Sequence, residues 1–472
     1  MISSNPDTWS IVSLSKAIRK KEISPVEITR AYLERIQSHD AKINSFITLL
    51  PCEALRAARQ AEKGIGKGKA LGPLHGIPFA AKDLFLTQGI RTTCGSKILK
   101  NFVPDYNATV IERLQAAGAI LLGKLNMHEF AYGTTSVNPH YGPVHNPWDR
   151  ERVPGGSSGG SAAALASAFV PLTLGTDTGG SIRIPSALCG TAGLKPTYGR
   201  ISRHGVYPLC WSLDHPGPMA RSVADLAMAM NVLAGPDPLD ASTSAVAVPD
   251  YPRGLSNHLK GISVGIPDAY YFDRLEPEVA AAVRKAIQVC KGLGATVKKI
   301  SILLLPEASI AAFIILLAEG AATLEKWHRT RPMDLGDDVR SRLNLGAVVT
   351  AAQYLRAQTI RRRVRETFSR VFQKVDVILT PQLPITAPGL TQRSVSWGKK
   401  TEAVPSALTR FTRIYNLVGI PSLSLPCGFS SSGLPIGLQV AGKPFDEATV
   451  LKVGHAYESH TPWKDRHPSL DR

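Results

Sequence analysis

Hydrophobic positions recur along the chain with two alternating spacings, one typical of helices and the other of buried strands. Residues 277–293 place Val279, Val283 and Ile287 on one helical face, and Gly294 ends that helix. Short stretches rich in apolar residues, which we interpret as buried strands, occupy residues 77–81, 119–122, 262–266, 377–379 and 422–425. Helices that alternate with such strands are typical of α/β sheet proteins.

This rhythm continues along the chain, with no polar or proline-rich break between its halves. We therefore expect a single domain over residues 1–472. Within it we expect an N-terminal helical part at 1–65, which includes a capping box at Ser24. A core at 70–235 holds the candidate chemistry, and a helical insertion occupies residues 302–374.

The composition is that of a folded protein. Hydrophobic residues make up 44% of the chain and charged residues 19%, which excludes a disordered chain. The six cysteines form no C-x-x-C pair, so we expect reduced, mostly buried thiols in a cytoplasmic protein. No signal peptide is expected, and the apolar stretch at 309–318 has about half the ~20 residues that a membrane span needs. We therefore expect no membrane partner.

Charge leaves two interpretations open. The chain has 55 basic and 37 acidic residues, a formal net charge of +18, which is typical of a nucleic-acid binder or of a solvated basic surface. The basic run at 361–365 shares a helix with the apolar stripe Ile360, Val364 and Phe368. We expect its arginines to coat the outer face of that helix. No aromatic-interleaved basic strand accompanies them, so the basic surface is favoured over a nucleic-acid partner.

Residues 154–200 carry the candidate chemistry. Two glycine and serine clusters, at 155–161 and 178–181, flank a run of small and apolar residues at 162–170. Glycines permit unusual backbone angles and let main-chain N–H groups approach a ligand closely. Hydroxyls among such glycines indicate a nucleophile beside an anion-stabilising hole. Two flexible linkers are the alternative, but a run fit for tight packing would not join two linkers.

This segment resembles the defining motif of the amidase signature family, whose members hydrolyse carboxamides and which is related to the A subunit of glutamyl-tRNA amidotransferase. The resemblance covers most of the chain, through further motifs at residues 75–78, 193–197, 212–218, 416–421 and 434–439. It implies an α/β fold with a mixed, mostly parallel central β-sheet and helices on both faces.

The resemblance also implies a triad of a lysine, a serine in a cis peptide and a nucleophilic serine, which map to Lys82, Ser157 and Ser181. A serine hydroxyl is a weak nucleophile until a base takes its proton. Lys82 can be that base only when neutral, and its place at the end of a buried strand offers the burial that lowers a lysine pKa. Ser157 would pass the proton between Lys82 and Ser181, and water would then resolve an acyl-enzyme.

The same resemblance implies an oxyanion hole made of backbone N–H groups of residues 178–181. Thr178, Gly179 and Gly180 are therefore expected to contact the substrate. The candidates for the pocket wall are Met127, Phe130, Tyr132, Cys210 and Trp211. Asp177 and Arg183, which flank the nucleophile, and Ser158 and Ser161 are expected to support the site. The reaction requires no metal or organic cofactor.

Three functions remain open. The first is a free-standing amidase that cleaves a small carboxamide through an acyl-enzyme on Ser181. The second is the glutaminase subunit of a tRNA-dependent amidotransferase. Family glutaminase subunits usually carry an acidic residue near 409–413, where this chain has none, and that difference favours the free-standing enzyme. The third is a non-catalytic, basic RNA-binding subunit. The expected partner is a small amide, and the sequence leaves a homodimer open.

One competing motif is the α/β-hydrolase elbow. Residues 156–160 match G-x-S-x-G and would make Ser158 the nucleophile, with His455 or His460 downstream. No strand pattern precedes Gly156, which argues against this interpretation.

Overall fold

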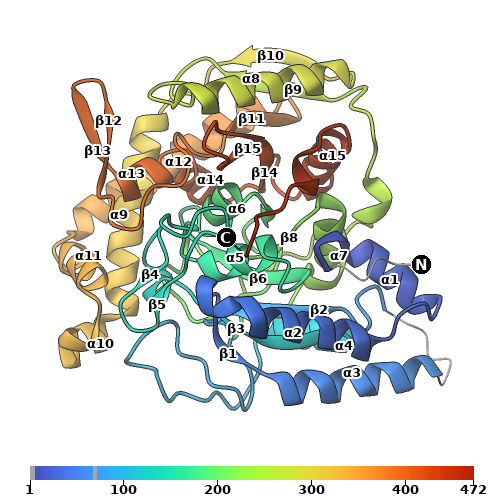
Figure 1. The fold of residues 1–472 in the computed structure, drawn as a ribbon. Coiled ribbons are helices and arrows are strands. Elements are labelled where there is room, and N and C mark those ends of the chain that lie inside the picture. Colours follow the sequence, from blue (N-terminus) through green and yellow to red (C-terminus); the bar gives the residue numbers. More distant parts are fainter. Residues whose placement is uncertain (1–5, 67–71, 472) are drawn as a thin grey trace.

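A long mixed sheet runs through the molecule (Figure 1), in a computed structural model that describes residues 6–66 and 72–471. Its strands are β1 (Phe46–Leu49), β2 (Pro78–Lys82), β3 (Ile120–Leu125), β6 (Leu172–Asp177), β7 (Ala192–Lys195), β8 (His215–Ala220), β9 (Ser263–Pro267), β10 (Thr296–Ile300), β11 (Val377–Pro381), β14 (Ser422–Phe429) and β15 (Pro435–Gly442). They lie in the order β1-β3-β2-β6-β8-β7-β14-β15-β11-β9-β10.

Parallel and antiparallel pairs occupy different parts of this sheet. β2 pairs in parallel with β3 and β6, and β9 pairs in parallel with β10 and β11. The pairs between β6 and β11 along the strand order, and the pair of β1 with β3, are antiparallel. The two small sheets are β4 (Val137–Asn138) with β5 (Gly142–Pro143) and β12 (Ser394–Trp397) with β13 (Lys400–Ala403).

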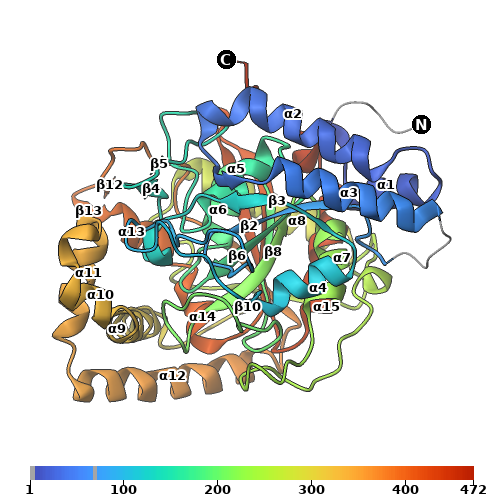
Figure 2. The same cartoon turned by 90° about the horizontal axis from the view of Figure 1, so that it is seen from below.

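Helices flank the central sheet in both views (Figures 1 and 2), which confirms the α/β class with a mixed sheet. They are α1 (Ile11–Arg19), α2 (Pro25–Ile43), α3 (Pro51–Gly66), α4 (Thr109–Ala116), α5 (Gly159–Ala166), α6 (Arg183–Cys189), α7 (Val223–Leu233), α8 (Pro277–Gly292), α9 (Leu305–Thr323), α10 (Glu325–Thr330), α11 (Asp337–Ala347), α12 (Ala351–Val371), α13 (Val404–Thr409), α14 (Arg413–Val418) and α15 (Glu447–Glu458).

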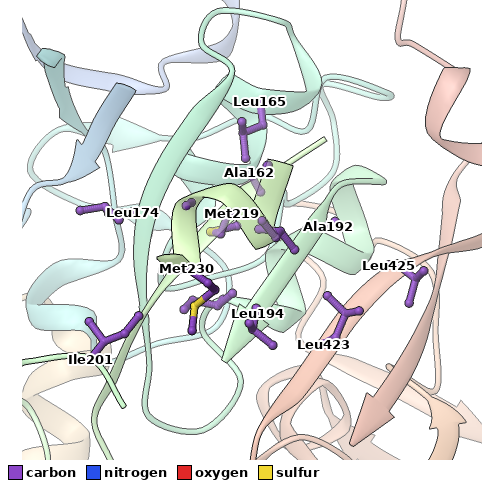
Figure 3. Packing of buried hydrophobic residues seen from close by; sticks show 14 of the residues in the cluster. Ala162, Leu165, Leu174, Ala192, Leu194, Ile201, Met219, Met230, Leu423 and Leu425 are labelled. Atoms are coloured by element: carbon purple, nitrogen blue, oxygen red, sulfur yellow. The ribbon is translucent and has the colours of Figure 1, made fainter. Parts of the chain in front are cut away.

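The small residues of α5 allow it to pack inside the molecule. Every residue of this helix is buried, and Ala162 and Leu165 lie in the same core cluster as Leu174 of β6 and Met219 of β8 (Figure 3). A Cβ at Gly160 would lie 2.3 Å from the carbonyl oxygen of Asn126, so only glycine fits there. The dense packing fixes the two glycine and serine clusters that flank the helix.

Helices α9, α10 and α11 stand together at the left of both views (Figures 1 and 2), inside the region expected as a helical insertion. The limits expected for the apolar stretch were 309–318, but the helix that contains it is longer. Helix α9 has 19 residues and includes both Glu307 and Glu319. By length and composition alone α9 could cross a membrane. It instead packs against α11, α12 and α14 and buries side chains such as Ile315.

The arginines of α12 do not all coat its outer face. Arg361 is buried and donates hydrogen bonds to the carbonyl oxygens of Leu417, at 2.7 Å, and Ser212, at 2.8 Å. Arg365 donates to the carbonyl oxygen of Val418. The expectation was wrong for Arg361 because a guanidinium can satisfy several backbone carbonyls at once and so joins a helix to the elements packed against it.

Candidate active site

Lys82 is the last residue of β2 and is fully buried. Its Nζ donates hydrogen bonds to Ser157 Oγ at 2.6 Å and to Thr176 Oγ1 at 2.9 Å. Burial lowers the pKa of Lys82 from 10.5 to about 7, while the more distant carboxylates of Asp214 and Asp177 act in the opposite direction. A substantial share of Lys82 is therefore neutral at physiological pH.

Ser157 lies in the loop just before α5, and the peptide bond that joins it to Gly156 is cis. Its carbonyl oxygen accepts a hydrogen bond from the N–H of His128 at 3.1 Å. The N–H of Ser158, the next residue, donates to the carbonyl oxygen of Ser181 at 3.2 Å. The two clusters that the sequence separates by α5 and β6 are thus in direct contact.

The loop that carries Ser181 is held by one buried carboxylate. Asp177, at the end of β6, accepts hydrogen bonds from the N–H groups of Gly180 at 2.7 Å and Ile182 at 3.2 Å. It also forms an ion pair of 2.9 Å with Arg183, and the Arg183 guanidinium keeps the pKa of Asp177 well below its usual range against the opposing effect of burial. Asn416 donates to the same carboxylate at 2.8 Å. These contacts give Asp177 and Arg183 the supporting role expected of them.

Two backbone amides beside Ser181 are free to bind an anion. Among residues 6–66 and 72–471, the N–H groups of Gly179 and Ser181 have no hydrogen-bond partner. The N–H of Gly180 is different, because it donates to Asp177. The expected contact of Gly180 with substrate is therefore corrected: its φ of +133° turns its amide toward Asp177 instead.

A cavity of about 320 Å³ opens beside Ser181. Thr178, Gly179 and Ser181 line one wall of it. The other walls come from residues 131–134, Leu209, Ala312, Phe313, Leu316, Arg342, Leu345, Pro405, Ser406, Thr409 and Arg413. Helices α9, α11 and α13 and the start of α14 therefore line the cavity. Their residues lie far from the glycine clusters in the sequence.

Met127 and Trp211 do not line this cavity. Met127 is fully buried in the core, and the side chain of Trp211 is 61% exposed and stacks on the Arg203 guanidinium, 4.2 Å from its ring centroid. Of the other candidates for the pocket wall, Tyr132 lines the cavity, whereas Phe130 and Cys210 are not among the lining residues. The chain turns after Met127, so that Ala131 and Tyr132 face the cavity in its place.

The sequence interpretation also missed residues that contact the site. Thr176 is the second hydrogen-bond partner of Lys82, and it could have been found as the residue just before Asp177 in the same buried strand. Arg342 and Arg413 bring positive charge to the cavity wall. No local sequence pattern predicts their position, because only the tertiary fold brings their helices to the site.

The competing motif places its serine elsewhere. The Ser158 hydroxyl donates to the carbonyl oxygen of Thr176 at 3.2 Å and is fully buried. It therefore ties α5 to β6 and does not reach the cavity.

A model of the family described as "Amidase" matches residues 27–451 of this chain. The A subunit of the glutamyl-tRNA(Gln) amidotransferase from Chloroflexus aggregans is 46% identical, over 97% of this chain and 97% of its own length. The corresponding protein of Geobacter metallireducens is 43% identical, over 96% of this chain and 97% of its own.

Solved structures give the same picture. A chain from a structure described as a vestigial protein complex that reveals the evolutionary origins of an s-triazine catabolic enzyme superposes with a TM-score of 0.92. It is 36% identical and covers 96% of this chain and 98% of its own. The A subunit of the Thermotoga maritima glutamyl-tRNA(Gln) amidotransferase has a TM-score of 0.83 at 32% identity, over 99% of this chain and 98% of its own.

Proposed function

This chain belongs to the amidase family, and on that premise we propose that it hydrolyses a primary carboxamide to a carboxylate and ammonia through an acyl-enzyme on Ser181. The observation that carries the proposal is the 2.6 Å hydrogen bond between the buried Lys82 amine and Ser157 Oγ, beside the loop of Ser181. Enzymes of this family cleave carbon–nitrogen amide bonds, and the geometry supplies the parts that such a cleavage needs.

The first step is attack by the Ser181 hydroxyl on the amide carbon. Neutral Lys82 accepts the proton of Ser157 as Ser157 accepts the proton of Ser181, so that the base acts across one intervening hydroxyl. The low pKa of Lys82, caused by burial, makes the neutral amine available near pH 7. The same chain of groups then returns a proton to the leaving nitrogen, and ammonia departs.

The negative charge that develops on the amide oxygen needs hydrogen-bond donors. The unpartnered N–H groups of Gly179 and Ser181 supply two, at the wall of the cavity where the amide would lie. One such donor typically contributes about 2.7–4 kcal/mol to lowering the barrier. In the second step water takes the place of the Ser181 hydroxyl, loses its proton along the same path and releases the acid.

The finer part of the proposal is the setting of this reaction, which is either a subunit of an amidotransferase or a free-standing amidase. The curated relatives described above belong to amidotransferases, at 43% and 46% identity over nearly the whole chain. They favour a glutaminase-type subunit, which passes ammonia to partner subunits, over the free-standing amidase expected from the sequence. A free-standing amidase stays as the second candidate on one observation, the lack of an acidic residue among those that line the cavity in the described chain.

The decisive experiment combines labelling with turnover. Purified full-length protein is treated with a fluorophosphonate, the labelled residue is identified by mass spectrometry, and ammonia release from glutamine and simple primary amides is measured. We expect label on Ser181 and loss of both label and activity in Ser181→Ala. Ser161→Ala is the matched control, because the buried Ser161 hydroxyl only donates to the carbonyl oxygen of Leu174.

Two results would contradict the proposal: label on Ser158, or full amide hydrolysis by Ser181→Ala. The setting is decided separately. Glutamine hydrolysis that appears only when the partner proteins of an amidotransferase are added supports the glutaminase role. Hydrolysis of simple amides by the chain alone, with no stimulation by those proteins, supports the free-standing enzyme.

A further inference from the structure

Arg413 brings a positive charge to the cavity and forms no ion pair in the described chain, although Glu402 acts on its pKa from a longer distance. It is half-buried and lines the same cavity as Ser181. Its Nε donates to the carbonyl oxygen of Thr409 at 3.3 Å, its Nη2 donates to the Thr409 hydroxyl, and its guanidinium carbon lies 5.5 Å from the ring centroid of Phe313. No ion pair forms between Arg413 and any Asp or Glu of residues 6–66 and 72–471.

The neighbouring arginines are compensated. Arg342, which also lines the cavity, donates to Asp338 at 2.8 Å. Arg410 lies 3.2 Å from Glu402, a carboxylate that Arg274 also approaches at 3.9 Å. Of the two arginines that line the cavity, Arg413 is thus the one without an ion-pair partner among the described residues. Burial lowers its pKa only to about 10, so the guanidinium stays protonated at neutral pH.

We infer that the substrate of this site carries a carboxylate that binds Arg413 and carries no ammonium group near it: the substrate class is the half-amide of a small dicarboxylic acid. This inference rests on the proposed amide hydrolysis in its second setting, the free-standing amidase, and names the substrate of that enzyme. The carboxylate would lie against Arg413 while the scissile amide lies against Ser181 and the free N–H of Gly179. A cavity of about 320 Å³ accommodates a chain of a few carbons between the two.

The lining offers nothing that would hold an ammonium group. Among the cavity-lining residues of the described chain, none is acidic, and the residue beside Arg413 is the neutral Thr409. An amino acid amide such as glutamine would bring its ammonium group into a cavity where two guanidiniums repel it. Guanidinium and carboxylate instead form short, charge-assisted hydrogen bonds, often as a bidentate pair.

The test uses three primary amides of one length that differ only at the far end. Succinamate ends in a carboxylate, butyramide in a methyl group and 3-aminopropanamide in an ammonium group, and glutamine is run beside them. We expect kcat/KM to be highest for succinamate and lowest for 3-aminopropanamide. In Arg413→Met we expect kcat/KM for succinamate to fall about 10- to 100-fold, mainly through KM, and kcat/KM for butyramide to fall far less. Arg362→Met is the matched control, since Arg362 is exposed and does not line the cavity.

Substitutions at position 409 test whether the preference for a carboxylate over an ammonium group can be reversed. Thr409→Asp places a carboxylate where the Thr409 hydroxyl now accepts from Arg413, whereas Thr409→Asn has the same shape without charge. We expect only the aspartate variant to lose the preference for succinamate and to improve on 3-aminopropanamide and glutamine. Thermal unfolding of each variant checks that it is folded.

Failure of this inference is separable from failure of the proposed function. Binding to Ser181→Ala protein, measured by calorimetry, needs no turnover and should be at least tenfold tighter for succinamate than for butyramide. Equal binding, a preference for glutamine, or an Arg413→Met variant that weakens all amides alike would overturn the inference. Discriminating binding without hydrolysis of any amide would leave the carboxylate site standing and reject the hydrolysis.

Discussion

The pH dependence of amide hydrolysis gives the sharpest test of Lys82. Because the neutral amine is the base, kcat/KM should rise with pH as Lys82 loses its proton and reach a plateau above the pKa of about 7. The rising limb of the plot of log kcat/KM against pH should have a slope of one, since a single proton is lost. A lysine in water would place the same limb near 10.4.

The size of the effect follows from the pKa. Lowering it from 10.5 to about 7 corresponds to roughly 5 kcal/mol of difference between the two protonation states of Lys82. About half of the molecules then hold the neutral base at pH 7, compared with about one in three thousand without the shift. The same proton affects the free energy of unfolding. Between about pH 7 and pH 10.5 the unfolded chain binds this proton and the folded chain does not, so this contribution to stability rises with pH.

The assay is ammonia release under kcat/KM conditions between pH 5.5 and 9.5, in buffers of constant ionic strength. Lys82→Ala should lower the plateau by about 10²–10⁴-fold and remove the limb. Lys82→Arg should be no better, because a guanidinium stays protonated throughout this range. Lys443→Met removes a half-exposed lysine paired with Asp376 and should keep both plateau and limb.

Three results would refute this reasoning. A limb near 10 would mean that the amine is solvated and not buried. A limb near 7 that persists in Lys82→Ala would assign the titration to another group. A Lys82→Arg protein with more than about a tenth of the wild-type plateau would mean that no neutral amine is needed.

Three further substitutions test the surroundings of the site. Thr176→Val removes the hydroxyl that accepts from Lys82, so we expect the pKa of Lys82 to fall further and the limb in the same pH profile to move to lower pH, with less than about a tenfold loss of plateau activity. Gly180→Ala puts a Cβ 2.4 Å from Thr412 Oγ1 at a positive φ, so kcat should fall about 10²–10³-fold, whereas Gly179→Ala, whose Cβ meets only Arg413 Cβ at 3.8 Å, should lose far less in the same ammonia assay. Arg183→Met leaves Asp177 buried without its ion-pair partner, which should cost about 3–5 kcal/mol of unfolding free energy in urea denaturation. The exposed Arg362→Met on α12 should stay within about 0.5 kcal/mol.

Periodicity predicted the elements that are buried on one face or on both. The strand expected at 119–122 is β3 (Ile120–Leu125), and the helix expected at 277–293 is α8 (Pro277–Gly292). The six cysteines are free thiols and five of them are buried, as the lack of C-x-x-C pairs indicated. The antiparallel middle of the sheet had no such signal, because strand direction depends on which distant strands pair and not on the pattern within each strand.

The cavity wall was beyond the reach of sequence patterns for a related reason. Ser157, Ser181 and Lys82 stand in recognisable motifs, but Phe313, Arg342 and Arg413 come from helices whose patterns only say that they are buried or charged. Their placement depends on how α9, α11 and α14 pack together. Substrate preference is therefore set by the part of the chain that local sequence patterns describe least.

The fold also explains why Lys82, and not the equally buried Lys124 beside it, can serve as the base. Lys124 lies on the neighbouring parallel strand β3, opposite Ala81, and is equally buried. Its Nζ lies 3.1 Å from Asp83, so it has a counter-ion. Among the described residues, Lys82 has only hydroxyl partners. The two carboxylates that act on it are bound elsewhere: Asp214 accepts from Thr178 Oγ1, and Asp177 pairs with Arg183.

Burial lowers the pKa of both lysines, but the adjacent carboxylate of Asp83 opposes that effect at Lys124 and favours its charged form. The parallel pairing of β2 with β6 brings the Lys82 amine to the same end of the sheet as Thr176 and the loop of Ser181. Placing a carboxylate beside Lys82, for example by Thr176→Asp, should therefore raise its pKa and abolish hydrolysis near pH 7. Activity should then recover only at alkaline pH, which the pH profile of that variant would measure.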